Sequence, residues 1–468
     1  MFFKRKKQFS VQKGMIIPFV IVFGSILTLI LVSLLGYVSY RYQQSVRQTY
    51  KANALQMAEA GLNYYYWYVL HTLEGKSSAQ LEAYWATAPL GVPSYENQVK
   101  DQSGKVIGVY RLEVTPPAKG STIIMAKIIG WDIKNAKLTR TIEARLRKPS
   151  WSEYSVIAND VMRFGEGTET WGPIYSNNGI HYDGVAHNLV SSYVTNTYWD
   201  PDYNAYKPGV WTSLPNEAQV FLAGKAYPVS YKDFNQVSVD FGVMKTYSAP
   251  TKGGLYFPAV NKKDCGYHVQ LRTDGKIRVA TVNTCDTSSY KIVKESSFTT
   301  YTMPTNGLIF FQANTWVEGS ISDKHLTIAA ADPDNGAVTN IYLFNDVTYT
   351  NTDGRDVLGL IAQNNVSVGL YSDDDLRIDA ALVAQIGRVG RDYYTYSDSN
   401  SYYIRNTITV NGAIATNSRY GFAWICGGTH CSGYRNRNII YDNNLLYTPP
   451  PFFPTGTHYS IDQWEEVN

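Results

Sequence analysis

The sequence lacks charge over one long stretch near its N-terminus. Residues 15–40 contain no charged side chain. As a helix rising about 1.5 Å per residue, this stretch is long enough to cross the roughly 30 Å hydrocarbon core of a bilayer. The segment before it carries Lys4, Arg5, Lys6, Lys7 and Lys13, and basic flanks stay on the cytoplasmic side. We therefore expect a single-pass anchor in the cell membrane, with everything after Tyr40 extracellular or periplasmic.

The features of a cleavable secretory signal are also missing. Such a signal has an apolar core of about 7 to 15 residues and ends in small residues, whereas this segment is longer and runs directly into Arg41 and Tyr42. We therefore expect an anchor that is retained. Gly14, the last residue before the apolar run begins at Met15, remains a candidate position for a different cut.

An excess of positive charge is absent outside the leader. The formal net charge of the 468-residue chain is only +3, so a broad basic surface for nucleic acid is not supported. The local exception is the run Tyr434-Arg435-Asn436-Arg437-Asn438, which suits DNA or an anionic sugar. A surface turn is the favoured interpretation of that run.

Motifs for catalysis are absent as well. The seven histidines are scattered and accompany no nucleophile motif or Gly-rich phosphate loop. Asp373, Asp374 and Asp375, followed by Asp379, form the densest carboxylate cluster, and such a cluster can bind calcium or serve a polysaccharide lyase or hydrolase. A solvated turn is the favoured interpretation. We therefore predict no enzyme, no catalytic residue, no cofactor and no metal site, with calcium and a polysaccharide-active enzyme as alternatives.

Cysteine is scarce, and its positions predict disulfides. Only Cys265, Cys285, Cys426 and Cys431 occur, an even number in the predicted outer part. A three-residue loop at 274–276 would place Thr273 opposite Ile277, and that register puts Cys265 directly opposite Cys285.

Cys426 and Cys431 bracket a short flexible loop that can close into a second disulfide. The alternative is a zinc site, but zinc needs four ligands and His430 supplies at most a third.

The N-terminus resembles a known family. A short basic leader ending in Gly14, the apolar helix that begins at Met15, and the helical stretch 54–62 together resemble type IV pilins and pilin-like proteins, in particular minor pilins of the PilX type. The resemblance covers the first seventy residues. It implies that a prepilin peptidase cuts between Gly14 and Met15, and that the helix is held first in membrane lipid and then among other pilin subunits.

One position departs from the family pattern. Major pilins carry a glutamate at the fifth mature position, where it pairs with the N-terminus of a neighbouring subunit. Counted from Met15, that position is Phe19. The resemblance therefore implies a tip or initiating component in place of a repeating subunit, and the alternative is an uncleaved anchor outside any filament.

The fold class predicted from the hydrophobic pattern is α+β. After the leader, 1–14, we expect a transmembrane and pilin-like helix at 15–74, with an apolar stripe formed by Val46, Tyr50, Leu55, Ala58, Leu62 and Val69. A small antiparallel β domain at 75–150 follows, with strands at 106–114, 121–131 and 137–147. The aromatic run 64–68 is expected to cover this domain.

The region 151–447 is predicted to be all-β and outside the cell. Short strand-like runs alternate with Asn, Asp and Gly turns, and similar phrases begin at Leu360, Leu382 and Ala413. Their uneven spacing favours a β-solenoid with insertions at its corners, while a β-sandwich is the alternative.

The Pro-rich tail, 448–468, contains Pro449, Pro450 and Pro451, which fix an extended conformation. We expect it to lie along the solenoid, with Phe452 and Phe453 covering the last rung; a docking peptide is the alternative.

The functional prediction is a structural or adhesive minor pilin-like protein. Its role would be pilus assembly, attachment to a host or abiotic surface or to polysaccharide, or DNA uptake. The 38 tyrosines and 10 tryptophans suit adhesion, because exposed aromatic rings add contact area at low entropy cost.

Overall fold

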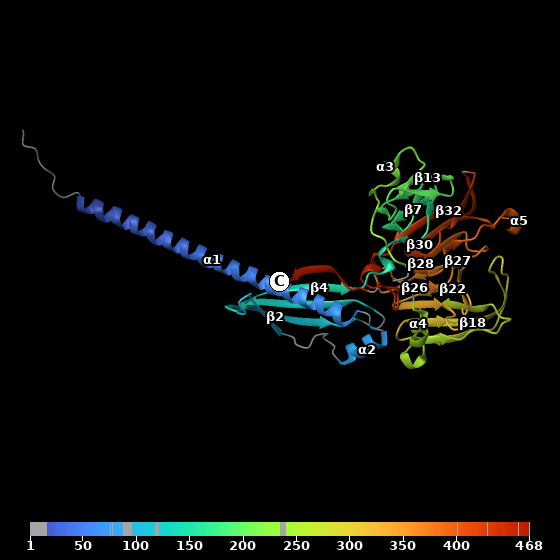
Figure 1. Ribbon diagram of the computed structural model, residues 1–468, viewed down its shortest axis with the longest axis horizontal. Helices are drawn as coiled ribbons and strands as arrows, with labels where there is room; N and C mark the ends of the chain where they lie inside the picture. The colour runs from blue at the N-terminus through green and yellow to red at the C-terminus, as the bar shows by residue number, and fades with distance from the viewer. Residues whose placement is uncertain are drawn as a thin grey trace, which may run out of the picture.

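The computed structural model describes residues 16–74, 76, 78–87, 96–117, 121–234, 240–399, 401–427, 429–456 and 458–467. It places a protruding helix, a small domain and a large β region in a row (Figure 1). This confirms the predicted α+β organisation, in which a long N-terminal helix precedes a large all-β region. The predicted leader and the processing position Gly14–Met15 lie outside the described residues.

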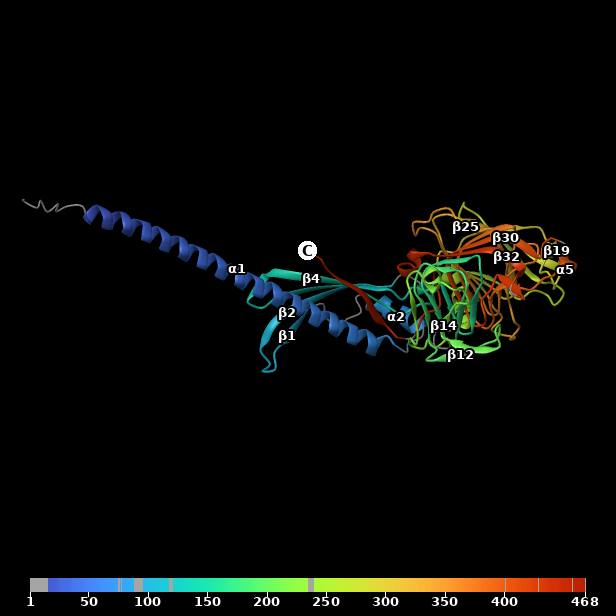
Figure 2. The same ribbon diagram turned by 90° about the horizontal axis from the view of Figure 1, so that it is seen from above.

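Helix α1 (Ile16–Thr72) has two halves with different surroundings. Its first half is exposed on every side, and in the view from above it extends away from all other elements (Figure 2). Within the described ranges, α1 is the one helix long and apolar enough to cross a membrane by length and composition. Its second half packs on the small domain through Ala54, Met57, Ala58, Gly61, Leu62, Tyr65 and Val69. Of the predicted stripe, Ala58, Leu62 and Val69 are buried, while Val46, Tyr50 and Leu55 are half-buried.

The small domain is a five-stranded antiparallel sheet under α1. Its strands, in spatial order, are β1 (Glu96–Lys100), β2 (Val106–Thr115), β3 (Ile124–Asp132), β4 (Asn135–Arg147) and β33 (Ser460–Val467). The three central strands lie where the hydrophobic alternation predicts them. Strands β1 and β33 and the short helix α2 (Ser78–Thr87) were not predicted.

Glycines let α1 approach this sheet closely. A Cβ atom on Gly130 of β3 would collide with the carbonyl oxygen of Ala54 and the backbone nitrogen of Ala58. A Cβ atom on Gly61 would lie 2.7 Å from both Ile128 and Tyr110. Gly61 weakens the isolated helix by about 1 kcal/mol relative to alanine, but here it permits backbone-close packing between helix and strand.

The aromatic run of α1 mostly covers the small domain, as expected. Tyr65 is fully buried in its core. The Tyr66 hydroxyl donates to the Tyr459 carbonyl at 3.3 Å, and Tyr84 of α2 donates to Tyr68. Trp67 remains about half exposed, beside His71.

The large β region contains short strands joined by turns and a few short helices. Its first part comprises η1 (Trp151–Glu153), β5 (Val156–Ala158), β6 (Met162–Phe164), β7 (Thr168–Trp171), β8 (Ile174–Ser176), β9 (Ile180–Tyr182), β10 (Val185–Ala186), β11 (Val190–Ser192), β12 (Thr197–Asp200), β13 (Ala205–Pro208), β14 (Val210–Trp211), α3 (Glu217–Val220), β15 (Lys225–Ala226), α4 (Phe241–Tyr247) and η2 (Pro250–Lys252).

The second part comprises β16 (Leu255–Phe257), β17 (Gly266–Leu271), β18 (Lys276–Cys285), β19 (Ile292–Glu295), β20 (Thr299–Thr302), β21 (Leu308–Phe311), β22 (Asn314–Ile321), β23 (His325–Ala330), β24 (Ile341–Leu343), β25 (Val347–Tyr349), β26 (Val357–Ala362), β27 (Val366–Val368), β28 (Asp375–Ala384), β29 (Val389–Arg391), α5 (Tyr396–Ser399), β30 (Ile404–Thr416), β31 (Ala423–Cys426), β32 (Thr429–Tyr441) and η3 (Asn443–Leu446).

A parallel, in-register ladder runs through this region in the spatial order β16–β21–β23–β26–β28–β30–β5–β8–β11–β15. Parallel stacking in register is the pairing that the solenoid interpretation requires. The stacked positions include Ile309, Ile328, Leu360, Leu382, Ile414, Val156, Ile174 and Val190. The predicted alignment of Leu360 with Leu382 is confirmed. That of Leu382 with Ala413 is wrong by one residue, because Leu382 lies opposite Ile414.

Both faces of this ladder are buried, which explains the continuous apolar phrases. Leu360 and Leu382 point into the interior core, while their neighbours Ile361 and Val383 point to the other face. The cover over that second face comprises Trp151, Phe234, Phe241, Met244, Tyr247, Leu445 and Phe453. The sequence of a strand that is buried on both faces is a continuous apolar run without alternation of apolar and polar residues.

The chain enters and leaves this ladder near its middle. Strand β5, the first after the small domain, pairs with β30, close to the end of the region. From β5 the chain builds outward to β15. The next strand of the ladder in sequence, β16, lies at the opposite end, and from there the chain returns strand by strand to β30. The two connections to the small domain therefore lie side by side, and η1 contacts η3.

The C-terminal segment differs in part from the predicted tail. Its prolines do lie against the large region: Pro450 is next to Gly359, and Pro451 is next to Gly307. They cross interior strands of the ladder, whereas the prediction placed Phe452 and Phe453 on a last rung. The chain then returns to the small domain, where β33 pairs with β4. Strand β33 was missed because residues 460–467 show no alternation of apolar and polar side chains, and because its pairing partner lies more than three hundred residues away in sequence.

Substituting Gly130 with alanine tests the close helix–sheet contact. The added methyl group has only backbone atoms to displace, so we expect a loss of about 1–3 kcal/mol in the free energy of unfolding of the small domain. Thermal unfolding of the detergent-solubilised chain, followed by circular dichroism, measures it. Gly36→Ala is the matched control, because nothing lies within 4 Å of a Cβ atom there. Equal melting temperatures for the two variants would contradict the packing argument.

Candidate functional site

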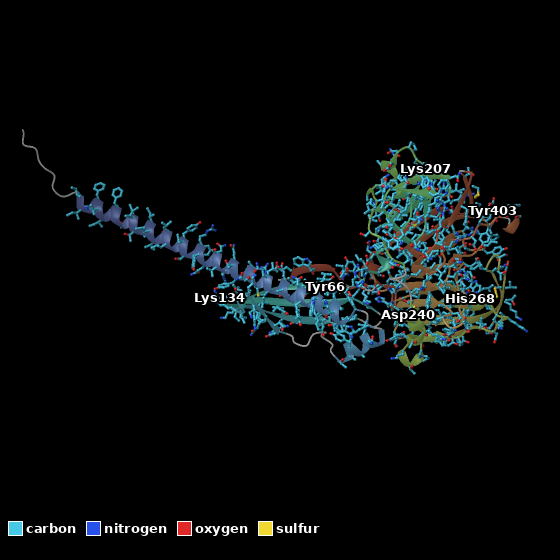
Figure 3. The ribbon with its side chains drawn as sticks, in the orientation of Figure 1. Tyr66, Lys134, Lys207, Asp240, His268 and Tyr403 are labelled. Carbon is cyan, nitrogen blue, oxygen red and sulfur yellow. A yellow bond between two sulfur atoms is a disulfide. The ribbon has the colours of Figure 1, made fainter. Side chains whose placement is uncertain are left out.

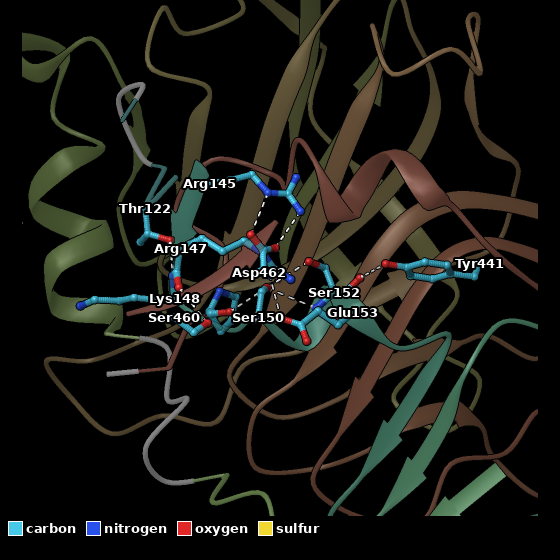
Figure 4. A network of polar contacts seen from close by, with 11 residues as sticks. Thr122, Arg145, Arg147, Lys148, Ser150, Ser152, Glu153, Tyr441, Ser460 and Asp462 are labelled. Atoms are coloured by element: carbon cyan, nitrogen blue, oxygen red, sulfur yellow. Dashed lines mark hydrogen bonds and ion pairs between the residues drawn. The ribbon is translucent and has the colours of Figure 1, made fainter. Parts of the chain in front are cut away.

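The junction between the small domain and the large β region is a polar network (Figure 4). Asp462 of β33 accepts hydrogen bonds from Arg145 Nε at 3.0 Å and Arg145 Nη2 at 2.7 Å. It also accepts from Arg147 Nε. Arg147 Nη1 pairs with Glu153 of η1 at 2.7 Å. Because Arg145 and Arg147 are largely buried, this network fixes β33 and η1 to β4.

Backbone and hydroxyl contacts extend the same network. The Ser150 hydroxyl donates to the Pro454 carbonyl at 3.1 Å, and Ser150 forms a capping box with Glu153 at the start of η1. Tyr441 donates to the Ser152 carbonyl at 2.7 Å. The outgoing and returning chains are thus hydrogen-bonded to each other and to the end of β32.

The charges of the junction are coupled. Burial opposes ionisation of Asp462, but hydrogen bonds from Arg145 and Arg147 outweigh it and lower the pKa of the Asp462 carboxyl. Burial likewise opposes the charge on Arg147, and its hydrogen bond to Asp462 overcomes this and raises the pKa of Arg147. The junction is therefore held by ionised partners.

The two cysteine pairs are joined as predicted. Cys265 bonds to Cys285 with a Cα–Cα distance of 6.1 Å, and Cys426 bonds to Cys431 with a Cα–Cα distance of 5.7 Å.

The predicted hairpin register between the first pair is wrong. Leu271, not Thr273, lies opposite Ile277, so the disulfide connects residues that are not directly opposite. The turn is wider than expected because Asp274 accepts from both Arg272 and the Lys276 backbone.

Three of the four carboxylates in 373–379, those of Asp374, Asp375 and Asp379, have hydrogen-bond partners. Asp379 is buried and accepts from the Tyr349 backbone at 3.0 Å and from Arg377 Nε at 2.9 Å. Asp374 and Asp375 lie at an exposed turn, where both bind Asn406. The exposed positions of Asp374 and Asp375 fit the favoured interpretation of a solvated turn, whereas Asp379 is buried within β28.

The run 434–438 is part of strand β32, so the predicted surface turn is wrong. Arg435 is exposed, whereas Arg437 is buried. Arg437 donates to the Tyr434 carbonyl at 2.8 Å and to the Thr168 hydroxyl at 2.9 Å. None of its partners among the described residues is a carboxylate.

Arg437 forms part of a cavity of about 130 Å³ that we call the arginine pocket. The pocket is lined by Arg163, Gly165, Thr168, Asp202, Arg388, Arg419, Tyr420, Gly421, Phe422, Ala423, Trp424, Ile425 and Arg437. Strands β6, β7, β31 and β32 and the loops at 202, 388 and 417–422 supply these residues. The disulfide Cys426–Cys431 closes the β31–β32 hairpin that carries Trp424.

Asp202 holds two of the pocket's arginines. It accepts from Arg419 Nη2 at 2.5 Å and pairs with Arg163 Nη1 at 3.3 Å. Burial opposes ionisation of Asp202, but hydrogen bonds from Arg419 and Arg163 outweigh it and lower the pKa of Asp202. Arg388 pairs with Asp392 at 2.8 Å and lies over the ring of Trp424.

His181, Asp200 and Asp202 form a cluster beside the pocket whose ligand atoms lie within 4.8 Å of one another. The acids are already engaged: Asp200 accepts from Tyr198 at 2.8 Å and from Trp211 Nε1 at 3.2 Å, and Asp202 binds two arginines. A cation here would have to displace those donors and would face two guanidinium groups. The contacts favour a structural network with His181 stacked on Trp211.

His268 forms a second charged cluster, on the side of the large region away from α1 (Figure 3). Its Nδ1 lies 2.8 Å from Glu295, and its Nε2 lies 3.3 Å from Glu318. Burial disfavours the charged ring, but hydrogen bonds to Glu318 and Glu295 outweigh it and raise the pKa of His268. The hydrogen bond from His268 in turn lowers the pKa of Glu318 to about 2.

Sequence inspection identified one part of the arginine pocket and missed the rest. Arg437 belongs to the run for which an anion was the less favoured alternative to a surface turn, whereas Arg163, Asp202 and Arg419 are isolated in the sequence. The ladder brings them together because β30 returns beside β5. Only the parallel pairing of distant strands could have revealed this.

Comparisons with known proteins are sparse. No protein-family model matches the chain, and no curated protein matches its sequence. Among solved structures it is similar to the competence-associated pilin ComZ from Thermus thermophilus, with 12% sequence identity and a TM-score of 0.31 over 90% of this chain and 98% of that chain. A similarity this low carries no argument about fold or function.

Replacing Asp462 with asparagine tests the junction. Arg145 loses its counter-charge and Arg147 keeps only Glu153, so we expect a loss of about 3 kcal/mol in the free energy of unfolding, at the lower end of the range for a broken buried ion pair. Asp323→Asn, which breaks an exposed pair with Arg355, should cost less than about 1 kcal/mol. Because the folded pKa of Asp462 is lowered, its contribution is present above pH of about 4 and is lost on further acidification. Chemical unfolding at pH 7 and pH 3 measures both effects, and an equal loss at the two pH values would contradict the assignment.

The His268 cluster predicts a pH dependence of opposite sign. Because the folded pKa of His268 is raised, its stabilising charge is present below the ordinary pKa of about 6.5 and is lost as pH rises through the folded value. Hydrogen exchange of β17, β19 and β22 should therefore accelerate between pH 6 and pH 9, after correction for intrinsic rates. His268→Gln should remove this dependence. His187→Gln, which removes an exposed pair with Glu169, should leave it in place.

Proposed function

We propose that this chain is a membrane-anchored, pilin-like structural or adhesive protein. One observation carries the proposal: α1 is a single helix whose first half is apolar and exposed and whose second half packs on an antiparallel sheet. The exposed half has no partner within the described residues, and such a surface requires lipid or other apolar helices.

The exposed half of α1 suits both environments in turn. Ile16, Leu27 and Leu35 are 77%, 61% and 65% exposed, so the apolar surface continues along and around the helix. Lipid satisfies that surface in the membrane, and the helices of other pilin subunits satisfy it in a filament. Prepilin peptidase, membrane lipid and other pilins are therefore the partners we propose for this segment.

Phe19 supports a position at a filament tip. Its side chain is 62% exposed on α1, and it supplies no carboxylate to pair with the N-terminus of a neighbouring subunit. A subunit without that contact fits an initiating or minor component better than a repeating one.

The large β region is the proposed adhesive part. It lies beyond the small domain, at the opposite end of the molecule from the apolar helix (Figure 1). It exposes aromatic side chains that include Trp199, Tyr206 and Tyr396, and such rings combine apolar contact area with polar hydrogen-bonding groups. We propose attachment as the main role, with pilus assembly and DNA uptake as other roles of the same kind of component.

The N-terminal mass of the protein recovered from cells tests this function. We expect a mature chain that begins at Met15 with a methylated amine, found in membranes and in sheared filament fractions. Retention of residues 1–14 and absence from sheared filaments would favour a membrane-anchored binding protein outside any filament. A chain recovered in the soluble cytoplasmic fraction would overturn the anchor itself.

A further inference from the structure

We propose that the arginine pocket binds the carboxylate of an acidic sugar in an anionic polysaccharide. The inference rests on the proposed adhesive function, since it names the ligand class of the outer region. It rests on the charge of the pocket, on two guanidinium groups held in place by Asp202, on the size of the cavity and on the aromatic ring beside it.

The pocket has more positive charge than its neighbours balance. Four arginines line it, and the carboxylates paired with them are Asp202, which is shared by Arg163 and Arg419, and Asp392, which pairs with Arg388. Arg437 is 3% exposed and is held by carbonyl and hydroxyl oxygens. Two formal positive charges therefore remain uncompensated around the cavity, one of them where water screens it poorly.

Two of the guanidinium groups at the pocket share one carboxylate. Asp202 already fixes the orientation of Arg163 and Arg419. Guanidinium groups held in place can offer paired N–H donors to a carboxylate.

The size of the cavity limits the ligand to a small group. At about 130 Å³ it is smaller than the roughly 300–1,000 Å³ of pockets that enclose a drug-sized ligand. It suits one charged substituent while the remainder of the ligand stays outside. Trp424 lies at the pocket and is 37% exposed, which offers a flat apolar surface for a sugar ring.

An acidic polysaccharide fits better than a nucleic acid. Nucleic acid is bound through several phosphates along a basic surface, whereas the net charge of the whole chain is +3 and the surplus here is confined to one cavity. A sugar carboxylate is planar and can accept paired N–H donors from a guanidinium group that is held in place.

Calorimetric titration of the full chain in detergent micelles tests the proposal. The probe is an oligogalacturonate, with the neutral galactose oligomer of equal length and a thymidine oligonucleotide as comparisons. We expect binding of the oligogalacturonate that weakens as salt rises, and at least tenfold weaker binding of both comparisons. Equal binding of the neutral oligomer, or tighter binding of the oligonucleotide, would overturn the assignment.

Arginine variants locate the site. Arg163→Gln and Arg419→Gln should each weaken oligogalacturonate binding by about tenfold or more, because a charge-assisted hydrogen bond is lost. Arg419→Lys, which keeps the charge but not the paired donors, should weaken it less. Arg355→Gln is the matched control: Arg355 also binds two aspartates, Asp323 and Asp353, but does not line the pocket. Equal weakening in Arg355→Gln would overturn the location, and near-ultraviolet circular dichroism verifies that each variant is folded.

Asp202→Asn separates anion binding from cation binding. Removing this competing carboxylate should tighten oligogalacturonate binding several-fold. A different pair of results would overturn the proposal in favour of a cation at the His181 cluster. In that case the native chain would bind oligogalacturonate only when calcium is added, and Asp202→Asn would abolish this binding. None of these results depends on the N-terminal mass, so failure of the ligand assignment and failure of the pilin-like function are distinguishable.

Discussion

The fold depends on one constraint: the large β region must begin and end at the same edge of the small sheet. The Asp462 carboxylate lies between Arg145 and Arg147, and this places β33 beside β4, from which the chain departs. Because both connections meet there, β5 and β30 must be neighbours in the ladder. The ladder is therefore built outward from β5 to one end and then back from the other.

This route explains the segments that have no regular strand pattern. Between β15 and β16 the chain must pass from one end of the ladder to the other, and helix α4 of this connection lies on the second apolar face, where Phe241 and Tyr247 are buried. The proline segment crosses the same face on its way back to the small domain, with Phe453 buried. Both segments supply the apolar cover that makes a double-sided buried ladder stable in water.

The sequence predicted the features that depend on local pattern. The helix, the three central strands of the small sheet and the matched phrases at Leu360 and Leu382 all follow from periodicity or repetition. Features that depend on distant partners were not predictable in this way. Strand β33 was missed because only its pairing with β4 marks it as a strand. The predicted hairpin register was wrong because Asp274 reorganises the turn. The arginine pocket combines residues from strands that are far apart in sequence.

The double connection also has a mechanical consequence. Tension between the large β region and helix α1 would pass along β4, which is covalently continuous with the small domain and α1. The returning strand β33 would be loaded in shear, since its ladder hydrogen bonds run from Ser460 opposite Arg147 to Val467 opposite Thr141 and lie across the direction of pull. Many hydrogen bonds would have to break together before the strand slipped. Joining a tethered head through two adjacent strands is a geometry suited to sustained traction.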